Sequence, residues 1–290
     1  MQTVPRPEPG EGEVLVAVHA AAITFAELGW EESWTHRPMI PSHEMSGVIA
    51  ACGAGVQDLA AGDEVFGLIR FDRLGVAAEY VCAPAADLAR RPCRVPHVVA
   101  AAVPLAGLTA WQALHDHARL RPHDEVLVHG GAGGVGAFAV QLAAQADAVV
   151  TATALGTADV ATARTLGAER GIDVATQAFD AGPARYDVVV DTVGGETLDR
   201  SYALLRRGGR LITLQAPPSA ERAAQYQATA EFFVVVPDRA ELNELAEMVD
   251  GDALQVTIAA TFPLADGKAA FESGQTWDRA PGKTVLVVRE

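Results

Sequence analysis

Apolar residues recur at every second position near the start of the chain. Residues 13–21 read EVLVAVHAA, and a period of two is the period of a β-strand. Shorter extended segments follow, separated by turns that contain Gly and Asp; they read EMSGVIAAC, DEVFGLI and VAAEYVCAP. The pattern predicts an all-β module over residues 1–96.

After Pro96 the sequence becomes Ala-rich and helix-forming, and then alternates between strand and helix patterns. The predicted strands lie at 124–130, 148–153, 170–173, 186–193, 209–215 and 230–236. A helix over 196–207 is expected to end at Gly208, since Gly favours helix C-termini. This alternation predicts an α/β fold with a doubly wound parallel sheet. The last strand, helix and strand, within 253–290, are expected to fold back onto the β module.

Composition and charge narrow the class of protein. The 290 residues suffice for two domains, and 50% of them are hydrophobic. A formal charge of −15 without any Lys/Arg cluster argues against nucleic acid or an anionic membrane as partner. No apolar run is long enough to span a bilayer and the start has no signal-peptide pattern, so we expect a cytoplasmic protein. Three widely spaced Cys residues predict neither a disulfide framework nor a thiolate zinc site.

A Gly-rich turn between a predicted strand and a predicted helix is the strongest chemical signal. Residues 125–136 read EVLVHGGAGGVG, and an Ala-rich helix follows at once. Glycines in such a turn let the backbone approach a pyrophosphate, which the helix N-terminus binds through its dipole and unpaired N–H groups. The alternative is a purely structural turn, but the βαβ setting favours dinucleotide binding. The predicted cofactor-binding residues of the loop are Gly131, Ala132, Gly133, Gly134, Val135 and Gly136.

His43 and Glu44, in the segment IPSHEMSG, raise the question of a metal site. Adjacent residues of an extended strand point to opposite faces, so the two side chains cannot easily chelate one ion. A catalytic zinc usually has three protein ligands. A metal site here would therefore need Glu27, His36 or a distant His to converge on the pair.

Five motifs occur in an order that identifies a family. They are PSHEMSG, GDEVFGL, LAGLTAWQAL, VLVHGGAGGVG and DTVGGETL, and together they resemble the zinc-independent medium-chain dehydrogenase/reductase family, quinone oxidoreductase type. The resemblance implies a Rossmann-type doubly wound sheet, residues 97–252, inserted into a GroES-like β domain, residues 1–96 and 253–290. It also implies that NADPH binds in a cleft between the domains and that quinones or activated double bonds are reduced.

The resemblance also bears on the metal question. In zinc-containing relatives the HE pair helps to build a metal site with cysteines elsewhere. The corresponding segments of this chain, AAITFAEL and PLAGLTA, contain no Cys. His43 and Glu44 therefore resemble the remnant of a zinc site in a branch that works without metal, and no metal ligand is predicted.

Two segments depart from the family pattern. The family has a V-N-P-x-D segment whose Asn touches the nicotinamide side of the cleft, and residues 23–27 replace it here. Two residues of this segment are the catalytic candidates: Thr24 offers a hydroxyl in place of the amide, and Glu27 is an acid. The stretch that normally selects the cofactor, TATALGTA at 151–158, has no ionisable side chain, although Thr153 and Thr157 offer hydroxyls. The family uses NADPH, while NADH, weak binding and no cofactor stay open alternatives.

Strand ends and one helix supply further candidates for the cofactor site. The LTAW motif contacts the nicotinamide region in the resembled family, which assigns Thr109 to the cofactor. Val193 and Gly194 follow one predicted strand and Gln215 ends the next, at the sheet edge where ligands bind. The structural alternative for Thr109 is a hydrogen bond within its own helix.

A substrate pocket is expected beside an irregular loop that carries several aromatic residues. Its candidate residues are Trp30, Trp34, His43 and Phe233. Loop packing is the alternative for the two Trp residues. For Phe233 the alternative is an apolar edge strand over 230–236 that pairs with a second copy of the chain and gives a homodimer.

Three interpretations of the function follow. The first is a NAD(P)H-dependent reductase of a quinone, enone or similar alkene, with a hydrophobic or ring-shaped substrate. The second keeps the fold but has weak or lost cofactor binding and acts as a cyclase, dehydratase or isomerase. The third is a non-enzymatic, nucleotide-responsive protein. Nucleotide binding discriminates the first from the second.

Overall fold

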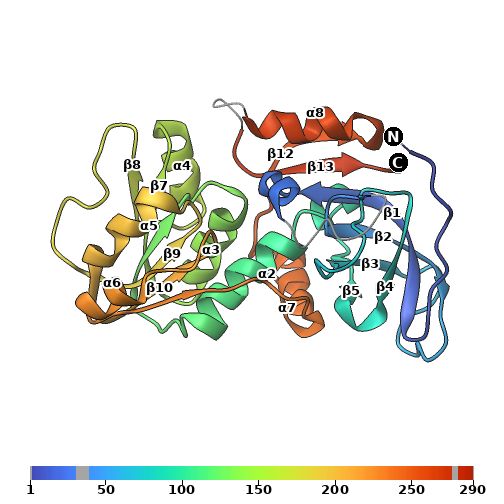
Figure 1. Ribbon diagram of the computed structural model, residues 1–290, viewed down its shortest axis with the longest axis horizontal. Coiled ribbons are helices and arrows are strands. Elements are labelled where there is room, and N and C mark those ends of the chain that lie inside the picture. The colour runs from blue at the N-terminus through green and yellow to red at the C-terminus, as the bar shows by residue number, and fades with distance from the viewer. Residues whose placement is uncertain (1, 31–38, 276–279, 290) are drawn as a thin grey trace. The chain divides into compact units, whose positions relative to one another are not determined.

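The computed structural model of the protein describes residues 2–30, 39–275 and 280–289. The chain forms two compact units (Figure 1). The β unit comprises Met1–Leu108 and Val236–Glu290, and the parallel-sheet unit comprises Thr109–Val235. The predicted β module and the predicted doubly wound parallel sheet are both confirmed.

The β unit is built on a seven-stranded sheet with the order β12-β13-β1-β2-β3-β5, in which β4 also pairs with β1. Its strands are β1 (Glu13–Ile23), β2 (Glu44–Cys52), β3 (Glu64–Leu68), β4 (Tyr80–Pro84), β5 (Leu88–Arg90), β12 (Ile258–Pro263) and β13 (Lys283–Val287). Its α-helices are α1 (His97–Ala100), α7 (Arg239–Asp250) and α8 (Gly267–Glu272), and 3-10 turns lie at Phe25–Gly29, Ala85–Asp87, Leu264–Asp266 and Ser273–Gln275. β13 runs antiparallel beside β1, so the C-terminal segment returns to the N-terminal strands, as predicted (Figure 1).

Strand β1 explains how the period-two pattern builds the core of this unit. Its valines at alternate positions are fully buried in one apolar cluster. A β-bulge between Val18 and Ala20 then changes which residues face that cluster. Beyond the bulge Ile23 faces the same cluster, whereas Ala20 packs in a second one. The bulge thereby sets how the end of β1, followed by Thr24 and Glu27, leaves the sheet.

The parallel-sheet unit has six parallel strands in the order β11-β10-β9-β6-β7-β8. The strands are β6 (Glu125–His129), β7 (Val149–Ala154), β8 (Arg170–Asp173), β9 (Tyr186–Asp191), β10 (Leu205–Thr213) and β11 (Thr229–Phe232). The α-helices are α3 (Gly134–Gln145), α4 (Thr157–Thr165), α5 (Gly195–Ser201) and α6 (Ala220–Gln225), with a 3-10 turn at Tyr202–Leu204. The strand order reverses between β6 and β9, and ligands of such sheets bind at the carboxyl ends beside that point.

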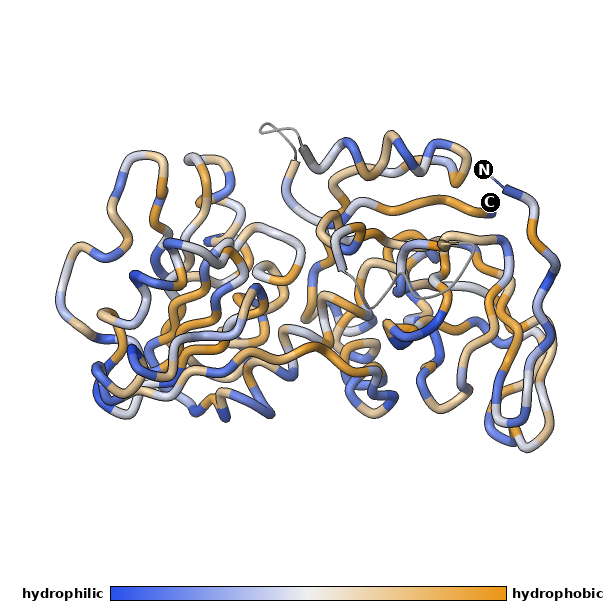
Figure 2. The backbone as a smooth tube through the Cα atoms, in the orientation of Figure 1, coloured by the Kyte–Doolittle hydropathy of each residue, from blue (hydrophilic) through white to orange (hydrophobic). Residues whose placement is uncertain are grey.

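Helix α2 (Pro104–Gln112) continues into a π-helical turn at Ala113–His117. Among the described residues, the helical stretch His97–His117 is long and apolar enough to cross a membrane, but 78% of its most apolar window is buried within the protein. A helix in the core of a protein can have the same length and apolar composition. Figure 2 shows that apolar residues also concentrate along the strands of both sheets.

The boundaries of the two units differ from the limits predicted for the Rossmann domain, 97–252. Residues 97–108 and 236–252 pack with the β unit. The reason is contact with that unit: α1 packs on β1 and β2, and α7 packs on β5. The Asp250 carboxylate, at the end of α7, also accepts hydrogen bonds from the backbone N–H groups of Cys93 and Arg94.

Two predicted elements of the parallel-sheet unit have different limits. The helix predicted over 196–207 ends at Ser201 as α5, a 3-10 turn follows up to Leu204, and strand β10 begins at the next residue. Leu205 is buried and pairs with Tyr186 of β9, so sheet pairing takes over where local sequence favoured helix. The edge strand predicted over 230–236 is shorter, and among the strands that the structure describes it pairs with β10 alone.

Candidate functional site

The Gly-rich loop lies between β6 and α3, as predicted, and is fixed by its own backbone. Gly131 N–H donates to the Thr153 carbonyl oxygen at 2.8 Å, and Gly133 N–H donates to the Gly130 carbonyl oxygen at 2.9 Å. A Cβ atom at Gly136 would lie 2.1 Å from the Gly130 oxygen, so only glycine fits there. A Cβ atom at Gly133 would meet only the Gly130 oxygen, at 3.2 Å. Gly136 is thus needed by the fold, as is Gly131, whose Cβ atom would lie 2.6 Å from that of Ala152, whereas Gly133 leaves space above the loop.

The N-terminus of α3 offers backbone donors at this loop. The first hydrogen bond of the helix runs from Ala137 N–H to the Gly133 oxygen. The N–H groups of Gly134, Val135 and Gly136 therefore precede the helical ladder. The first turn contains no acidic residue. These donors, with the positive end of the helix dipole, suit an anionic group such as a pyrophosphate.

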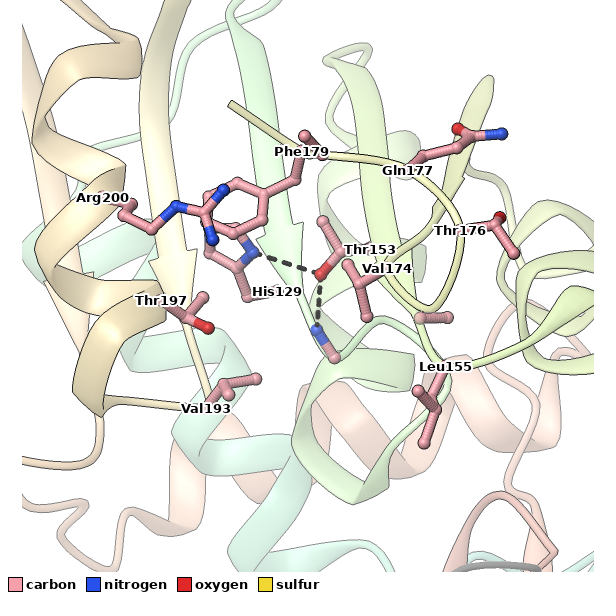
Figure 3. A pocket seen from close by; sticks show the side chains of 13 residues that line it. His129, Thr153, Leu155, Val174, Thr176, Gln177, Phe179, Val193, Thr197 and Arg200 are labelled. Atoms are coloured by element: carbon pink, nitrogen blue, oxygen red, sulfur yellow. Dashed lines mark hydrogen bonds between the residues drawn. The ribbon is translucent and has the colours of Figure 1, made fainter. Parts of the chain in front are cut away.

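A cavity of about 600 Å³ adjoins the loop. Residues at the carboxyl ends of β6 and β7, in the segment after β8, and on α5 line it (Figure 3). The connection from β8 to β9, residues 174–185, has turns but no helix, and it forms one wall through Thr176 and Phe179. The cavity therefore lies at the strand ends beside the reversal of strand order, where the fold places ligands.

The floor of the cavity holds a chain of neutral hydrogen bonds that runs through His129, and Figure 3 shows the bonds that the Thr153 hydroxyl makes in it. Ser201 Oγ donates to the Thr197 carbonyl oxygen at 2.7 Å, so it accepts from His129 Nε2 at 2.9 Å. His129 Nδ1 then accepts from the Thr153 hydroxyl at 3.1 Å. Burial lowers the pKa of His129 to about 4, against a smaller opposing effect of Asp191. The imidazole is therefore neutral at pH 7, and the floor carries no charge.

Part of the rim of the cavity is apolar, next to the polar side chains of Thr176 and Gln177. Leu155, Val174 and Val193 are 51%, 42% and 53% exposed, which is unusual for three large apolar side chains so placed. Arg200 lies over the Phe179 ring, 4.6 Å from its centre. A flat, partly apolar ring system can insert between such side chains while its polar edges reach the floor.

Asp191, fully buried at the end of β9, fixes the turn that carries two predicted cofactor residues. Its Oδ1 accepts from Val193 N–H at 3.1 Å and from Gly194 N–H at 3.0 Å, and its Oδ2 accepts from Thr213 Oγ1 at 2.9 Å. The exposed Gln215 side chain donates to the Thr192 carbonyl oxygen at 3.0 Å. Val193 and Gly194 are therefore held rigidly.

In the β unit, Glu27 and His43 lie together in a buried polar group. Glu27 Oε1 accepts from Ser42 N–H at 2.9 Å, and Glu27 Oε2 lies 3.6 Å from His43 Nδ1. Ser42 has a φ of 67°, a conformation that costs free energy in a residue other than glycine. Its hydroxyl donates to the Ala22 carbonyl oxygen at 2.6 Å, which holds that conformation. The His43 ring contacts Phe71 edge-on at 5.0 Å.

Glu44 has different partners from His43, as opposite faces of an extended segment predict. Glu44 forms a buried ion pair with Lys283 and accepts a hydrogen bond from Leu105 N–H at 3.0 Å. Lys283 Nζ also lies 3.2 Å from the Ile23 carbonyl oxygen and 3.5 Å from Thr24 Oγ1. Thr24 is thereby connected to the HE segment through Lys283.

The donor set around the HE segment does not fit a zinc ion. Within residues 2–30, 39–275 and 280–289, no group of three His, Cys, Asp or Glu side chains is placed to hold a metal. Glu44 is already neutralised by Lys283, whose ammonium would repel a dication. No step of the chemistry is assigned to a metal.

The remaining predicted residues lie apart from these groups. Thr109 is buried in α2, and Thr157 is exposed at the start of α4. Trp30 is partly buried and contacts Phe71 edge-on at 5.2 Å, on the same ring that touches His43. Phe233 stacks on His117 at 4.1 Å, beyond the edge strand β11, and does not line the cavity. The prediction for Trp34, like that for the aromatic loop around it, lies outside the described residues.

Sequence reasoning missed most of the cavity. Thr153 and Val193 were predicted, whereas His129, Phe179 and Arg200 were not. His129 left a signal, because a His at the end of the apolar strand VLVH is out of pattern. Phe179 and Arg200 left none, since they reach the cavity from an irregular segment and from the outer helix α5.

The fold and these groups define a dinucleotide-binding protein of the dehydrogenase class. The family description "Alcohol dehydrogenase GroES-like domain" matches residues 10–93, and "Zinc-binding dehydrogenase" matches residues 166–286. A probable mitochondrial zinc-binding oxidoreductase of Arthroderma benhamiae is 30% identical, with 99% of this chain and 92% of the relative covered. A 2-methylene-furan-3-one reductase of Solanum lycopersicum is 30% identical, with 97% of this chain and 73% of the relative covered.

Solved structures point to the same class of protein as the sequence comparisons. The quinone oxidoreductase of Coxiella burnetii superimposes with a TM-score of 0.91 at 31% identity, covering 99% of this chain and 93% of that one. The chain belongs to the medium-chain dehydrogenase/reductase family, quinone oxidoreductase type. It is an oxidoreductase, and its family implies a nicotinamide cofactor.

Proposed function

We propose that the protein is an NAD(P)H-dependent reductase of a quinone, an enone or a similar activated double bond, and that it works without a metal ion. The observation that carries the proposal is the cavity beside the Gly loop in the parallel-sheet unit. A helix N-terminus suits a pyrophosphate and a cavity with a partly apolar rim suits a nucleobase. The two features together match a dinucleotide better than any smaller anion.

The residues that would hold the cofactor follow from the geometry. The N–H groups of Gly134, Val135 and Gly136 would bind the pyrophosphate. Leu155 and Val193, exposed on the rim, would flank the adenine, which would rest on the neutral floor of the cavity. The space above Gly133, which a side chain would fill, supports this assignment.

A bound nicotinamide supplies the hydride, so the chain needs only to orient the acceptor, polarise it and exclude water. Thr24 is the candidate for polarising the acceptor. Since Lys283 Nζ donates to Thr24 Oγ1, the hydroxyl hydrogen of Thr24 is left to donate to a substrate carbonyl oxygen. Glu27 is engaged by Ser42 N–H in the buried group, so we assign the proton to solvent.

The class of acceptor rests on the relatives. One similar structure is named a quinone oxidoreductase, and one similar sequence is named a 2-methylene-furan-3-one reductase. Both names describe an electrophilic carbon conjugated to a carbonyl group. The proposal for this chain is the same class of acceptor.

The metal-free part of the proposal rests on the donor set. Glu44 is paired with Lys283, and the segments that carry zinc-binding Cys in relatives have none here. Elemental analysis of active protein tests it directly. Stoichiometric zinc, with activity lost on chelation, would overturn it.

We also propose a homodimer formed through β11. This strand is the edge of the sheet, and Val234, just beyond it, is 56% exposed. An edge strand followed by exposed apolar residues is an aggregation hazard unless another chain covers it.

The redox proposal is tested by following the oxidation of NADH and NADPH with para-benzoquinone and with methyl vinyl ketone as acceptors. We expect oxidation of the nucleotide by wild-type protein and reduction of the acceptor, confirmed by product analysis. Nucleotide binding without reduction of any conjugated acceptor would overturn the acceptor class. Absence of binding to either nucleotide at millimolar concentration would instead favour a non-redox enzyme on the same fold.

A further inference from the structure

We infer that the chain prefers NADH to NADPH and that Asp173, assisted by Asp159, decides the preference. The inference rests on the proposed function, since it concerns the ribose end of the same nucleotide site. It departs from the NADPH that the family resemblance implies.

The relevant place is the turn after β7. In sheets of this type the group that reads the 2′ position of the adenosine ribose lies at the end of the second strand, an acid for NAD and a base for NADP. Strand β7 ends at Ala154 and is followed by Leu155, which can neither accept a hydrogen bond from a hydroxyl nor pair with a phosphate. Gly156 comes next, with a φ of 85°. The selecting group must therefore come from a neighbouring segment.

Asp173 supplies a carboxylate to this turn from the neighbouring strand β8. Its side chain is 7% exposed, and its Oδ1 accepts from Gly156 N–H at 2.8 Å and from Ala175 N–H at 3.0 Å. Both hydrogen bonds fall on the same oxygen. The carboxylate is thus fixed against the backbone of the turn, where an acid favours a ribose hydroxyl and repels a phosphate.

Asp159 adds a second negative charge at the same place. It lies in the first turn of α4, which begins directly after Gly156. The positive end of a helix dipole would otherwise attract a phosphate, and an acid in the first turn offsets that field.

The cations that the described part of the parallel-sheet unit brings near this turn are already engaged. The sequence of the parallel-sheet unit, 109–235, contains no Lys. Among the described residues that line the cavity, the cation is Arg200, which pairs with Asp180 through two contacts of 2.8 and 2.5 Å. Arg164, in the last turn of α4, donates to the Glu169 carbonyl oxygen at 3.3 Å. A 2′-phosphate would therefore meet the carboxylates of Asp173 and Asp159, while the described Arg200 and Arg164 already have other partners.

The test is a fluorescence titration of the full chain with NADH and with NADPH at low and at raised salt. Asp173→Asn removes the charge but keeps an oxygen for both N–H donors, and Asp159→Asn removes the charge in α4. Asp116→Asn, an exposed acid of the same unit, is the control for a general loss of negative charge. Thermal unfolding checks that each variant is folded.

We expect wild-type protein to bind NADH about tenfold more tightly than NADPH, from two partly screened like-charge contacts. Each Asn variant should lower the Kd for NADPH about threefold, with little gain for NADH, and raised salt should narrow the gap. The control should change neither ratio.

Equal or tighter binding of NADPH by wild-type protein would overturn the inference and leave the proposed reductase intact. A preference for NADH that both Asn variants retain unchanged would overturn the role of these two acids. Failure of either nucleotide to bind at millimolar concentration would remove the proposed function, and the inference with it.

Discussion

Glu44 and Lys283 form an ion pair in which both side chains are buried, with 1% and 7% of their surface exposed. The pair joins the first residue of β2 to the first residue of β13. Burial raises the pKa of the Glu44 carboxyl, and the nearby charge of Lys283 opposes that effect. Since Lys283 also contacts Thr24, the pair connects the packing of the β unit to a candidate catalytic hydroxyl.

Lys283→Met should destabilise the protein strongly, because it leaves a buried carboxylate without its partner. Removing one member of a buried pair typically costs about 3 to 5 kcal/mol. The double variant Glu44→Gln/Lys283→Met, which removes both charges, should lose markedly less. Urea unfolding at pH 7 measures both. Equal losses in the two variants would show that packing, and not the pairing of charges, holds β13 in place.

Gly133→Val should abolish nucleotide binding and leave the fold largely intact. A Cβ atom at Gly133 meets only one backbone oxygen, at 3.2 Å, and otherwise points into the space assigned to the pyrophosphate. Gly136→Ala is the matched comparison, since its Cβ atom would lie 2.1 Å from the Gly130 oxygen and should disrupt the loop itself. Nucleotide titration and thermal unfolding separate the two effects. Undiminished binding by folded Gly133→Val protein would contradict the site.

Thr157→Arg should raise the affinity for NADPH and leave that for NADH nearly unchanged. Thr157 is the exposed first residue of α4, beside the turn that follows β7. A charge-assisted contact with a phosphate is worth roughly 1.5 to 3 kcal/mol, or about tenfold to a hundredfold in affinity. Titration with both nucleotides measures the change. An equal gain for NADH would indicate a general charge effect.

Stability should fall as the pH is lowered from about 6.5 to about 4. Burial lowers the pKa of His97 to about 4, with a further effect of His19, and burial likewise lowers that of His129 to about 4. Between these pH values the unfolded chain binds protons that the folded chain does not, so unfolding is favoured, by up to about 1.4 kcal/mol per pH unit for one His.

Urea unfolding at a series of pH values checks this dependence. His97→Gln should make the pH dependence shallower, whereas His123→Asn, at an exposed position, should not. A free energy of unfolding that stays constant through this range would contradict the burial of these rings as described.

Val234→Lys should convert the proposed dimer into a monomer, because it places a charge at the edge that the second copy would cover. Leu74→Lys, which changes an exposed apolar residue of the β unit, is the control. Light scattering at micromolar concentration measures the mass. A wild-type monomer at that concentration would contradict the dimer.

Much of the fold was predictable because its signals are local. Alternating valines in β1 and the Gly loop before α3 depend on strand period and on backbone space, and both can be read from neighbouring residues. Prediction was wrong where a distant partner outweighed local preference. Leu205 continues a helical pattern, yet it forms a strand because β9 offers it backbone hydrogen bonds and a buried site beside Tyr186.

The sequence by itself determined two domain types, their order along the chain, the Gly-rich loop before α3 and the family. The tertiary structure alone decided which side chains meet. His129 meets Ser201 and Asp173 meets the Gly156 backbone because strand order brings separate segments of the sheet to one edge. Glu44 meets Lys283, far along the chain, because β13 returns to β1. Such contacts depend on the register and packing of elements distant in sequence, which no local pattern of hydrophobic and polar residues encodes.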